Sequence, residues 1–159
     1  MSARTGIGWD SHRLVEGRPL VLGGVRIPFE RGLAGHSDAD VLAHAVIDAL
    51  LGAAALGDIG HHFPDTDERW AGADSMALLR TVVGLLADRG LRVRHVDTTV
   101  VMERPKLAPH RDAIREGLAG ALGVGLGDVN VKASTGEGMG FVGRGEGVAA
   151  LAVATLSRA

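Results

Sequence analysis

Hydrophobic residues follow two different spacings along the chain, and the change of spacing divides it into strands and helices. Residues 4–9, 92–101, 129–133 and 147–156 are alternating or continuously apolar, which predicts strands. Apolar residues recur at helical spacing in 38–56, 74–89 and 109–122, which predicts three helices. Residues 19–28 predict a hairpin, because Gly23 and Gly24 accept the positive φ that a tight turn needs.

The order of these elements predicts an α/β (α+β) fold, a mixed sheet with three helices packed on one face and a small hairpin near the N-terminus. Strands and helices alternate in the middle of the chain, and strands close its end. The last predicted strand reads GVAALAVATL and is apolar on both faces, so we expect other parts of the structure to pack against each face. We expect another subunit to supply the second cover. Because no low-complexity linker divides the 159 residues, we expect a single domain, 1–159.

The composition excludes several classes of function. The formal net charge is -2 and only 3% of the residues are aromatic, which disfavours binding to nucleic acid or to an anionic membrane. Cysteine is absent, so any metal must be held by His, Asp and Glu. The chain has neither a signal-peptide pattern nor an apolar run long enough to span a membrane, so we expect a cytoplasmic protein.

The stretch GWDSHRL places Asp10 and His12 two residues apart, just after the first predicted strand. If that strand continues, both side chains project to the same side and can meet one metal ion, while Ser11 points the other way. The alternative is a surface turn, which Asp and Ser start readily.

The predicted helix 38–56 carries a second candidate, His44. Asp40, His44 and Asp48 form one stripe along it, and Asp38 is a plausible N-cap. The stripe is either a solvated face or a half-buried metal ligand, with Asp48 fixing the other ring nitrogen of His44. Asp10, His12 and His44 would leave a fourth position open, as in catalytic zinc sites. The same three groups could also work as an acid–base cluster without a metal.

Three further segments hold candidate chemistry. In 57–70, Asp58 and backbone donors could bind sugar hydroxyls, or the segment is an ordinary loop. In 103–114, Arg104 and Lys106 beside prolines form a cationic corner suited to phosphate, or a surface connector. In 130–147 a strand runs into a glycine-rich loop, where small residues let backbone N–H groups approach an anion and Glu137 could bind Mg²⁺. A flexible hairpin is the alternative there.

Taken together, these motifs resemble the 2-C-methyl-D-erythritol 2,4-cyclodiphosphate synthase family of the non-mevalonate isoprenoid pathway. The resemblance runs over almost the whole chain and is carried, in order, by GWDSHRL, LGGVRIPFERGL, HSDADVLAHAVIDALLGAAALGDIGHHFPDTD, GADS, ERPKLAPH, DVNVKASTGEGMGF and GRGEG. It implies a homotrimer of small α/β subunits. It also implies a metal-dependent phosphorus–oxygen lyase that cyclises 4-diphosphocytidyl-2-C-methyl-D-erythritol 2-phosphate and releases CMP.

The resemblance also implies roles for individual residues. Zn²⁺ would be held by Asp10, His12 and His44, and Mg²⁺ or Mn²⁺ by Glu137 together with substrate phosphates. His36 and Thr135 match positions that stabilise the transition state. The implied substrate-binding positions are Asp10, Ser11, His12, His36, Ser37, Asp58, Ile59, Gly60, Phe63, Pro64, Asp65, Thr66, Asp67, Met102, Glu103, Arg104, Pro105, Lys106, Leu107, Ala108, Ser134, Thr135, Gly136, Glu137, Phe141 and Arg144.

Within that set the resemblance makes three finer distinctions. The segment Met102 to Ala108 and Ser134 would form a cytidine and phosphate pocket supplied across a subunit boundary. Phe141 and Arg144 would lie near a central cavity that binds isoprenoid diphosphates. The segment STGE departs from the family's usual TTTE, so Gly136 lacks a hydroxyl, and no role is assigned to His61 or His62.

Two other functions share some of these residues. A zinc-dependent phosphoesterase would use the same metal ligands with water as nucleophile, and would give a linear product. A trimeric module that senses a nucleotide or an isoprenoid diphosphate would need Phe141 and Arg144 but not the three metal ligands.

Overall fold

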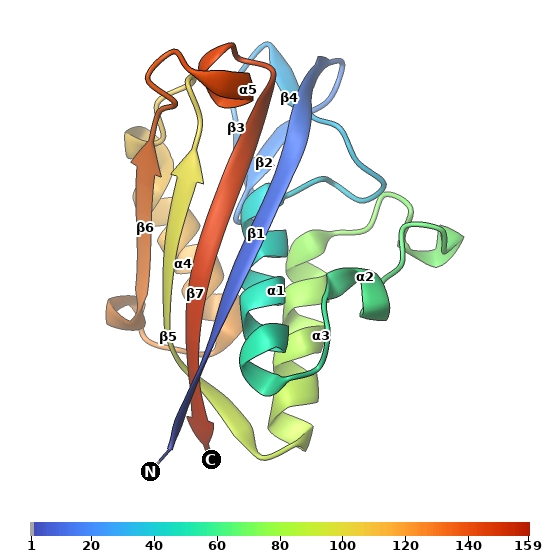
Figure 1. Cartoon of the computed structure of the whole chain (residues 1–159), viewed down its shortest axis with the longest axis vertical. Helices are drawn as coiled ribbons and strands as arrows, with labels where there is room; N and C mark the ends of the chain where they lie inside the picture. Colours follow the sequence, from blue (N-terminus) through green and yellow to red (C-terminus); the bar gives the residue numbers. More distant parts are fainter. Residues whose placement is uncertain (1) are drawn as a thin grey trace.

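The protein folds as a five-stranded mixed sheet with its long helices on one side, in a computed structural model that describes residues 2–159 (Figure 1). The sheet order is β4-β1-β7-β5-β6, where only β5 and β6 pair in parallel. The strands are β1 (Ala3–Glu16), β2 (Leu20–Leu22), β3 (Val25–Ile27), β4 (Arg31–Leu33), β5 (Leu91–Val101), β6 (Val129–Ser134) and β7 (Gly147–Arg158). The helices are α1 (Val41–Ala54), α2 (Ile59–His62), α3 (Ser75–Asp88), α4 (Arg111–Leu122) and α5 (Gly140–Gly143).

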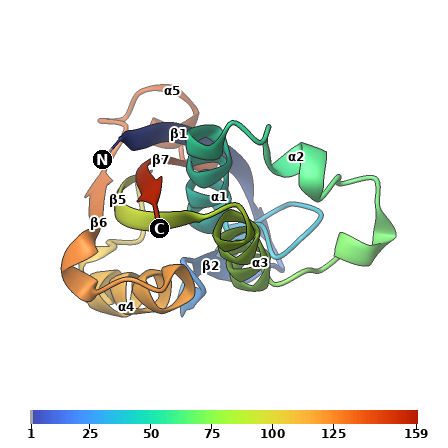
Figure 2. The same ribbon diagram turned by 90° about the horizontal axis from the view of Figure 1, so that it is seen from below.

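The three long helices lie together on one face of the sheet, as the sequence predicts (Figures 1 and 2). Helix α1 packs against β1, β7 and α3, while α4 packs against β6 and α3. The short helices α2 and α5, and the short strand β4, were not predicted, since four or fewer residues are too few for a periodic pattern. No helix within residues 2–159 has the length and apolar character needed to cross a bilayer.

The opposite face of the sheet carries exposed apolar side chains. Ile7 and Val153 are directly paired across β1 and β7 and are 70% and 41% exposed, and Trp9 beside them is 54% exposed. The inward residues of β7, including Ala150, Ala152 and Ala154, are buried under the helices. Strand β7 is apolar on both faces: the helices of the same chain cover one face, and the other face is open to solvent.

Strand β1 extends well beyond the predicted end at residue 9. It pairs with β7 from Ala3↔Ser157 to Arg13↔Gly147, and with β4 from Leu14↔Leu33 onward. The polar triplet after Trp9 interrupts the apolar pattern, but its pairing with residues 148–150 of β7 keeps the backbone extended. The turn interpretation of GWDSHRL is therefore wrong.

The predicted N-cap of the first long helix is also wrong by two residues. Asp40 caps α1 by accepting from the N–H of Ala43 at 2.9 Å, and it also accepts from the N–H groups of Gly23 and Gly24 at 2.9 and 2.7 Å. Its side chain is fully buried, and this burial raises the pKa of Asp40 to about 6 although the three N–H donors oppose the shift. Asp40 thus ties the start of α1 to the hairpin turn and does not lie on a solvated stripe.

Two glycines let α1 approach β1 closely. A methyl group on Gly8 would overlap the carbonyl oxygen of Ala45 and lie 2.8 Å from the nitrogen of Ala49. One on Gly6 would overlap Ala49 and Ala53 in the same way. Both glycines share the helix-facing side of β1 with Asp10 and His12. The distance between helix and strand at the candidate site is therefore set by the absence of side chains there.

Replacing Gly8 with alanine should force α1 away from β1. We expect the free energy of unfolding to fall by about 1–3 kcal/mol, the usual cost of overpacking a core. Gly84→Ala is the matched control, because a methyl group there meets nothing within 4 Å and lies mid-helix in α3. That change should raise stability by about 0.5–1 kcal/mol. Urea denaturation measures both, and equal stability of the Gly8 variant and the parent would contradict the tight contact.

Candidate metal and substrate site

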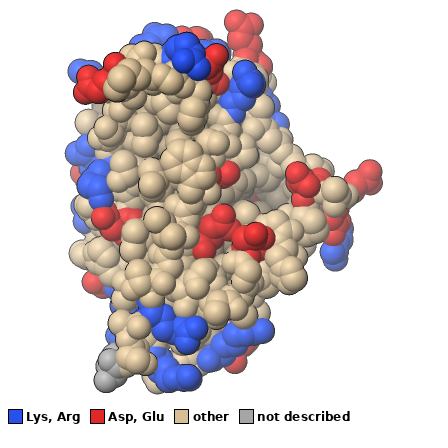
Figure 3. Space-filling model, in the orientation of Figure 1, with Lys and Arg blue, Asp and Glu red and all other residues tan. Residues whose placement is uncertain are grey.

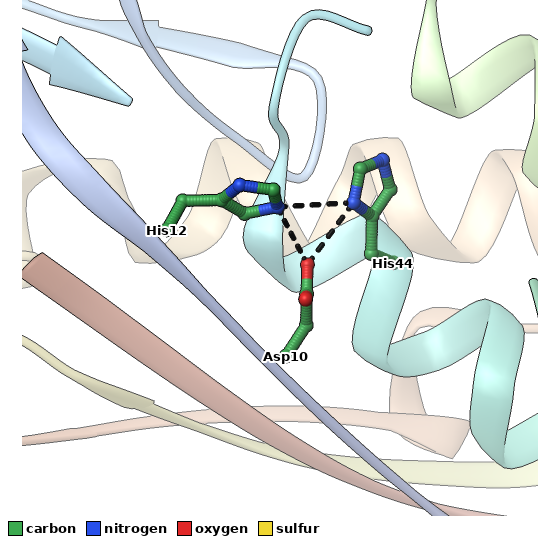
Figure 4. A group of neighbouring side chains, drawn as sticks. All are labelled: Asp10, His12 and His44. Carbon is green, nitrogen blue, oxygen red and sulfur yellow. Dashed lines mark hydrogen bonds and ion pairs between the residues drawn. The ribbon is translucent and has the colours of Figure 1, made fainter. Parts of the chain in front are cut away.

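Three side chains from two elements converge on one point (Figure 4). Asp10 and His12 project from the same face of β1, and His44 reaches them from the first turn of α1. Asp10 Oδ2 lies 2.8 Å from His12 Nε2 and 3.0 Å from His44 Nδ1, and the two ring nitrogens are 3.3 Å apart. Ligands at about 2.0–2.1 Å from a tetrahedral zinc would be about 3.3 Å from one another, so this triangle fits a divalent metal.

The second nitrogen of each ring has its own partner. His12 Nδ1 lies 2.8 Å from the carbonyl oxygen of Ala34, which can only accept, so Nδ1 carries a proton and Nε2 is the nitrogen that faces Asp10. His44 Nε2 lies 2.8 Å from Ser75 Oγ and 3.2 Å from Ser37 Oγ. Oriented rings with outer partners of this kind are typical of metal-binding histidines.

Asp48 does not act as the outer partner of His44, contrary to the prediction. Its carboxylate accepts from the N–H of Ile59 at 2.7 Å and so fixes the start of α2. The partner is Ser75, the first residue of α3, whose hydroxyl bonds the carboxylate of Asp38. Sequence spacing along one helix could not reveal this, because Ser75 comes from a different helix.

The electrostatics of the cluster favour an ionised Asp10. Burial alone would raise the pKa of Asp10, but hydrogen bonds and charge from His12 and His44 lower it to about 2. Burial lowers the pKa of His12, yet the hydrogen bond and charge of Asp10 outweigh it and raise that pKa. The group therefore offers one carboxylate and two imidazoles to a cation.

A pocket of about 380 Å³ opens beside the cluster. Figure 3 shows this face hollowed between the sheet and the projecting segment that carries α2. The predicted residues that line the pocket are His12, His36, Ser37, His44, Ile59, Gly60, Phe63, Pro64 and Asp65. Gly35, Trp70 and Leu78 also line it and were missed, although the aromatic Trp70 could have been suspected from its place beside the loop.

Other predicted residues of this region hold the loop in place. Asp58 caps α2 through the N–H of His61, and Asp67 caps the turn that follows and pairs with Arg69. His36 Nε2 donates to the carbonyl oxygen of Asp67 at 3.0 Å. Thr66 and these capping side chains do not line the pocket.

A second pocket of about 240 Å³ lies at the ends of β5 and β6. It is lined by the predicted residues Met102, Glu103, Pro105, Lys106, Leu107, Ala108, Ser134 and Thr135, together with Ala133 and Arg111, which were not predicted. The guanidinium of Arg104 instead lies over the Phe29 ring, 5.6 Å from its centroid, and 3.6 Å from Glu30.

The STGE segment bends tightly after β6. The N–H of Gly136 donates to the carboxylate of Glu103, and a methyl group on Gly136 would lie 2.8 Å from the nitrogen of Gly143. A threonine here would need the backbone of Met139 and Gly143 to shift. Glu137 is exposed and has a φ of 54°. Within residues 2–159, the group of side chains close enough together to hold a metal ion is Asp10, His12 and His44, and Glu137 is not part of it.

The remaining predicted positions lie toward the open face of the sheet. Ser11 points away from Asp10 and lines a shallow pocket of about 210 Å³ with Phe141 and Glu146. Arg144 pairs with Glu146 at 2.9 Å and lines another pocket with Arg31. His12 also lines the shallow pocket, and it is the lining residue that this pocket shares with the pocket of about 380 Å³.

The pocket beside the cluster and the pocket at the ends of β5 and β6 sit on different parts of the sheet and share no lining residue. Strand β1 is separated from β6 by β7 and β5. At about 4.8 Å between neighbouring strands, three steps amount to about 14 Å. One chain therefore presents the Asp10 cluster and the STGE segment as two separate surfaces.

Comparison with known proteins gives one family. A family model described as the YgbB family matches residues 3–157. The chain is 63% identical over 156 residues to the 2-C-methyl-D-erythritol 2,4-cyclodiphosphate synthase of Salinibacter ruber, covering 98% of this chain and 99% of that protein. The synthase of the same name from Symbiobacterium thermophilum is 63% identical over 152 residues, covering 96% and 97%.

Solved structures agree with these relatives. The bifunctional IspDF from Campylobacter jejuni superposes with a TM-score of 0.96 at 42% identity, and the match covers 99% of this chain and 43% of that one. This chain thus spans less than half of the bifunctional protein. A 2C-methyl-D-erythritol-2,4-cyclodiphosphate synthase in a CDP-bound form superposes with a TM-score of 0.89 at 42% identity, covering 97% of this chain and all of that one.

The lowered pKa of Asp10 predicts an acid-dependent loss of stability in metal-free protein. A carboxyl group with a folded-state pKa near 2, below its ordinary 3.8, stabilises the fold above about pH 4 and loses this contribution as the pH falls toward 2. The parent should therefore lose on the order of 2 kcal/mol more unfolding free energy than Asp10→Asn across that range. Chelator-treated samples unfolded in urea at each pH measure this, and parallel curves would contradict the ion pair.

Proposed function

The chain belongs to the YgbB family, and from this membership we propose that it converts 4-diphosphocytidyl-2-C-methyl-D-erythritol 2-phosphate to 2-C-methyl-D-erythritol 2,4-cyclodiphosphate with release of CMP. The observation that carries the proposal is the Asp10, His12 and His44 triangle beside a pocket lined by the predicted substrate residues. The whole chain would act as one domain in this reaction. The curated relatives are matched over nearly their full length.

The donor set suits Zn²⁺ held by Asp10, His12 and His44. One carboxylate oxygen and two neutral imidazole nitrogens are ordinary zinc ligands, and the His12 tautomer leaves its Nε2 free to bind. When bound, zinc would supply Lewis-acid polarisation of a phosphate oxygen in its open position. The carboxylate of Glu137 would contribute to a Mg²⁺ or Mn²⁺ site together with the substrate's diphosphate.

The reaction needs positioning more than a protein nucleophile. An oxygen of the 2-phosphate forms a bond to the β-phosphorus, and the bond from that phosphorus to the oxygen bridging to the α-phosphorus breaks. CMP leaves with the electron pair. The pocket beside the cluster would bind the erythritol end through Ser37 and the 59–65 segment, with His36 near the transferring phosphate. Thr135 would contribute a hydrogen bond from the second pocket.

A homotrimer would complete the site. The cluster and the STGE segment lie on separate strands of one sheet, so a second copy would have to bring its own Met102 to Ala108 segment to the first copy's cluster. The open sheet face with Ile7, Trp9 and Val153 offers apolar surface for that contact. Phe141, which is 39% exposed, and Arg144 would then lie where the copies meet and could bind an isoprenoid diphosphate.

Replacing His44 with alanine removes one ligand and should reduce CMP release to background while the trimer persists. CMP release from the cytidylyl substrate, bound zinc and light scattering measure the three properties. His62→Ala is the control, because its ring bonds the carbonyl oxygen of Leu56 outside the cluster. Full turnover by the His44 variant without bound zinc would contradict the proposed metal-dependent cyclase. A linear product from the parent would indicate a phosphoesterase instead.

Replacing Glu137 with glutamine should slow catalysis more than it affects folding, because a neutral amide is a poor ligand for a hard cation. We expect turnover to fall on the order of a hundredfold, as for loss of one strong charge-stabilising group. Glu116→Gln makes the same change on the exposed side of α4 and should leave turnover unaltered. Unchanged turnover of the Glu137 variant at low Mg²⁺ would remove that residue from the site.

A further inference from the structure

The outer nitrogen of His44 faces a buried hydrogen-bonded chain that ends on a carboxylate. His44 is 9% exposed, and its Nε2 lies 2.8 Å from the hydroxyl of Ser75, which has no exposed surface. The same hydroxyl bonds Asp38 Oδ1. The chain His44–Ser75–Asp38 therefore joins a residue of α1, the first residue of α3 and the segment between β4 and α1.

The available protons fix which group donates and which accepts at each step of the hydrogen-bonded chain His44–Ser75–Asp38. A carboxylate has no proton to donate, so the single hydroxyl proton of Ser75 goes to Asp38. The Ser75 oxygen can then only accept from His44, which places the ring proton on Nε2. Nδ1, which faces Asp10 and His12, is thereby the ring nitrogen left to bind a metal.

The carboxylate is itself held rigidly with both oxygens as acceptors. Asp38 Oδ2 accepts from the N–H of Ser75 at 3.0 Å, and Oδ1 accepts from the N–H of Asp40 at 3.2 Å in addition to the Ser75 hydroxyl. An amide in this place would turn its NH₂ group toward at least one N–H donor. Only a carboxylate can therefore accept all three of these hydrogen bonds, so the ionised side chain of Asp38 supports the direction of the chain.

Ser37 offers a weaker and undirected alternative. Its hydroxyl oxygen lies 3.2 Å from His44 Nε2 and accepts from the N–H of Ala39 at 3.1 Å. Because its proton has no carboxylate acceptor in the hydrogen bonds of residues 2–159, it could be donated to Nε2, and the ring proton would then move to Nδ1. That tautomer would put a proton where the metal ligand is needed.

We propose that Ser75 and Asp38 are positioning residues that commit His44 to the tautomer whose Nδ1 binds the metal. The inference rests on the metal site of the proposed function but not on the reaction carried out there. Ser75 contacts only the outer nitrogen, so it acts through His44 and not on substrate. Loss of an outer partner of this kind typically weakens metal binding by about 10–100-fold.

Zinc affinity of the full chain, measured by competition with a chromophoric chelator and without substrate, tests the proposal. Ser75→Ala and Asp38→Asn should each bind zinc about 10–100-fold more weakly than the parent, and Ser75→Thr, which keeps the hydroxyl, should recover most of the loss. Asp74→Ala is the matched control. It removes the cap that Asp74 gives the N–H of Met76 at the same helix start, with no contact to His44. The control should lower the thermal midpoint without changing zinc affinity.

Nitrogen-15 spectra of the metal-free protein give a readout that a structural role would not move. In the parent, His44 should carry a proton on Nε2, and in Ser75→Ala and Asp38→Asn a population protonated on Nδ1 alone should appear. The proposal is overturned if both variants bind zinc as tightly as the parent, if Asp74→Ala weakens zinc binding equally, or if parent His44 carries no proton on Nε2. Absence of cyclase activity with these outcomes intact would instead overturn only the proposed function.

Discussion

The backbone of α1 lies directly against the backbone of β1, and the candidate site exists because of this contact. Gly6 and Gly8 present no side chains to the helix, and Ala45, Ala49 and Ala53 form the helix surface that meets them. His44 directly precedes Ala45, so its ring emerges where the strand continues into Asp10 and His12. A larger residue at either glycine would separate the imidazole from the carboxylate by more than a ligand triangle tolerates.

Two carboxylates, one buried and one half-buried, hold the segments around that contact. Asp40 joins the start of α1 to the hairpin turn, and Asp38 joins the start of α3 to the segment leading into α1. In each case the carboxylate accepts several hydrogen bonds, which offsets the cost of removing it from water. Both carboxylates thus accept from N–H groups that a helix start normally leaves unpaired, and Asp38 also orients His44 through Ser75.

The arrangement of strands separates the chemistry of one chain into two surfaces. The cluster belongs to β1 and α1, whereas the glycine-rich segment follows β6, with β7 and β5 between them. A rigid sheet cannot fold back to unite these surfaces, which is the physical reason for placing a second copy in the proposed site. The uncovered face of β1 and β7 agrees with this, since its apolar side chains Ile7, Trp9 and Val153 are exposed in the single chain.

The sequence by itself determined the type of fold, the three long helices, the hairpin turn and the identity of the Asp10, His12 and His44 donors. Those features depend on local spacing and on side-chain chemistry, and both can be recognised in the amino-acid sequence. Only the tertiary structure decided that β1 continues through the polar triplet, that Asp40 and not Asp38 caps α1, and that Ser75 and not Asp48 bonds His44. Each of these depends on a partner brought from elsewhere in the chain, and spacing along one element carries no information about which distant backbone or hydroxyl will lie within hydrogen-bond distance.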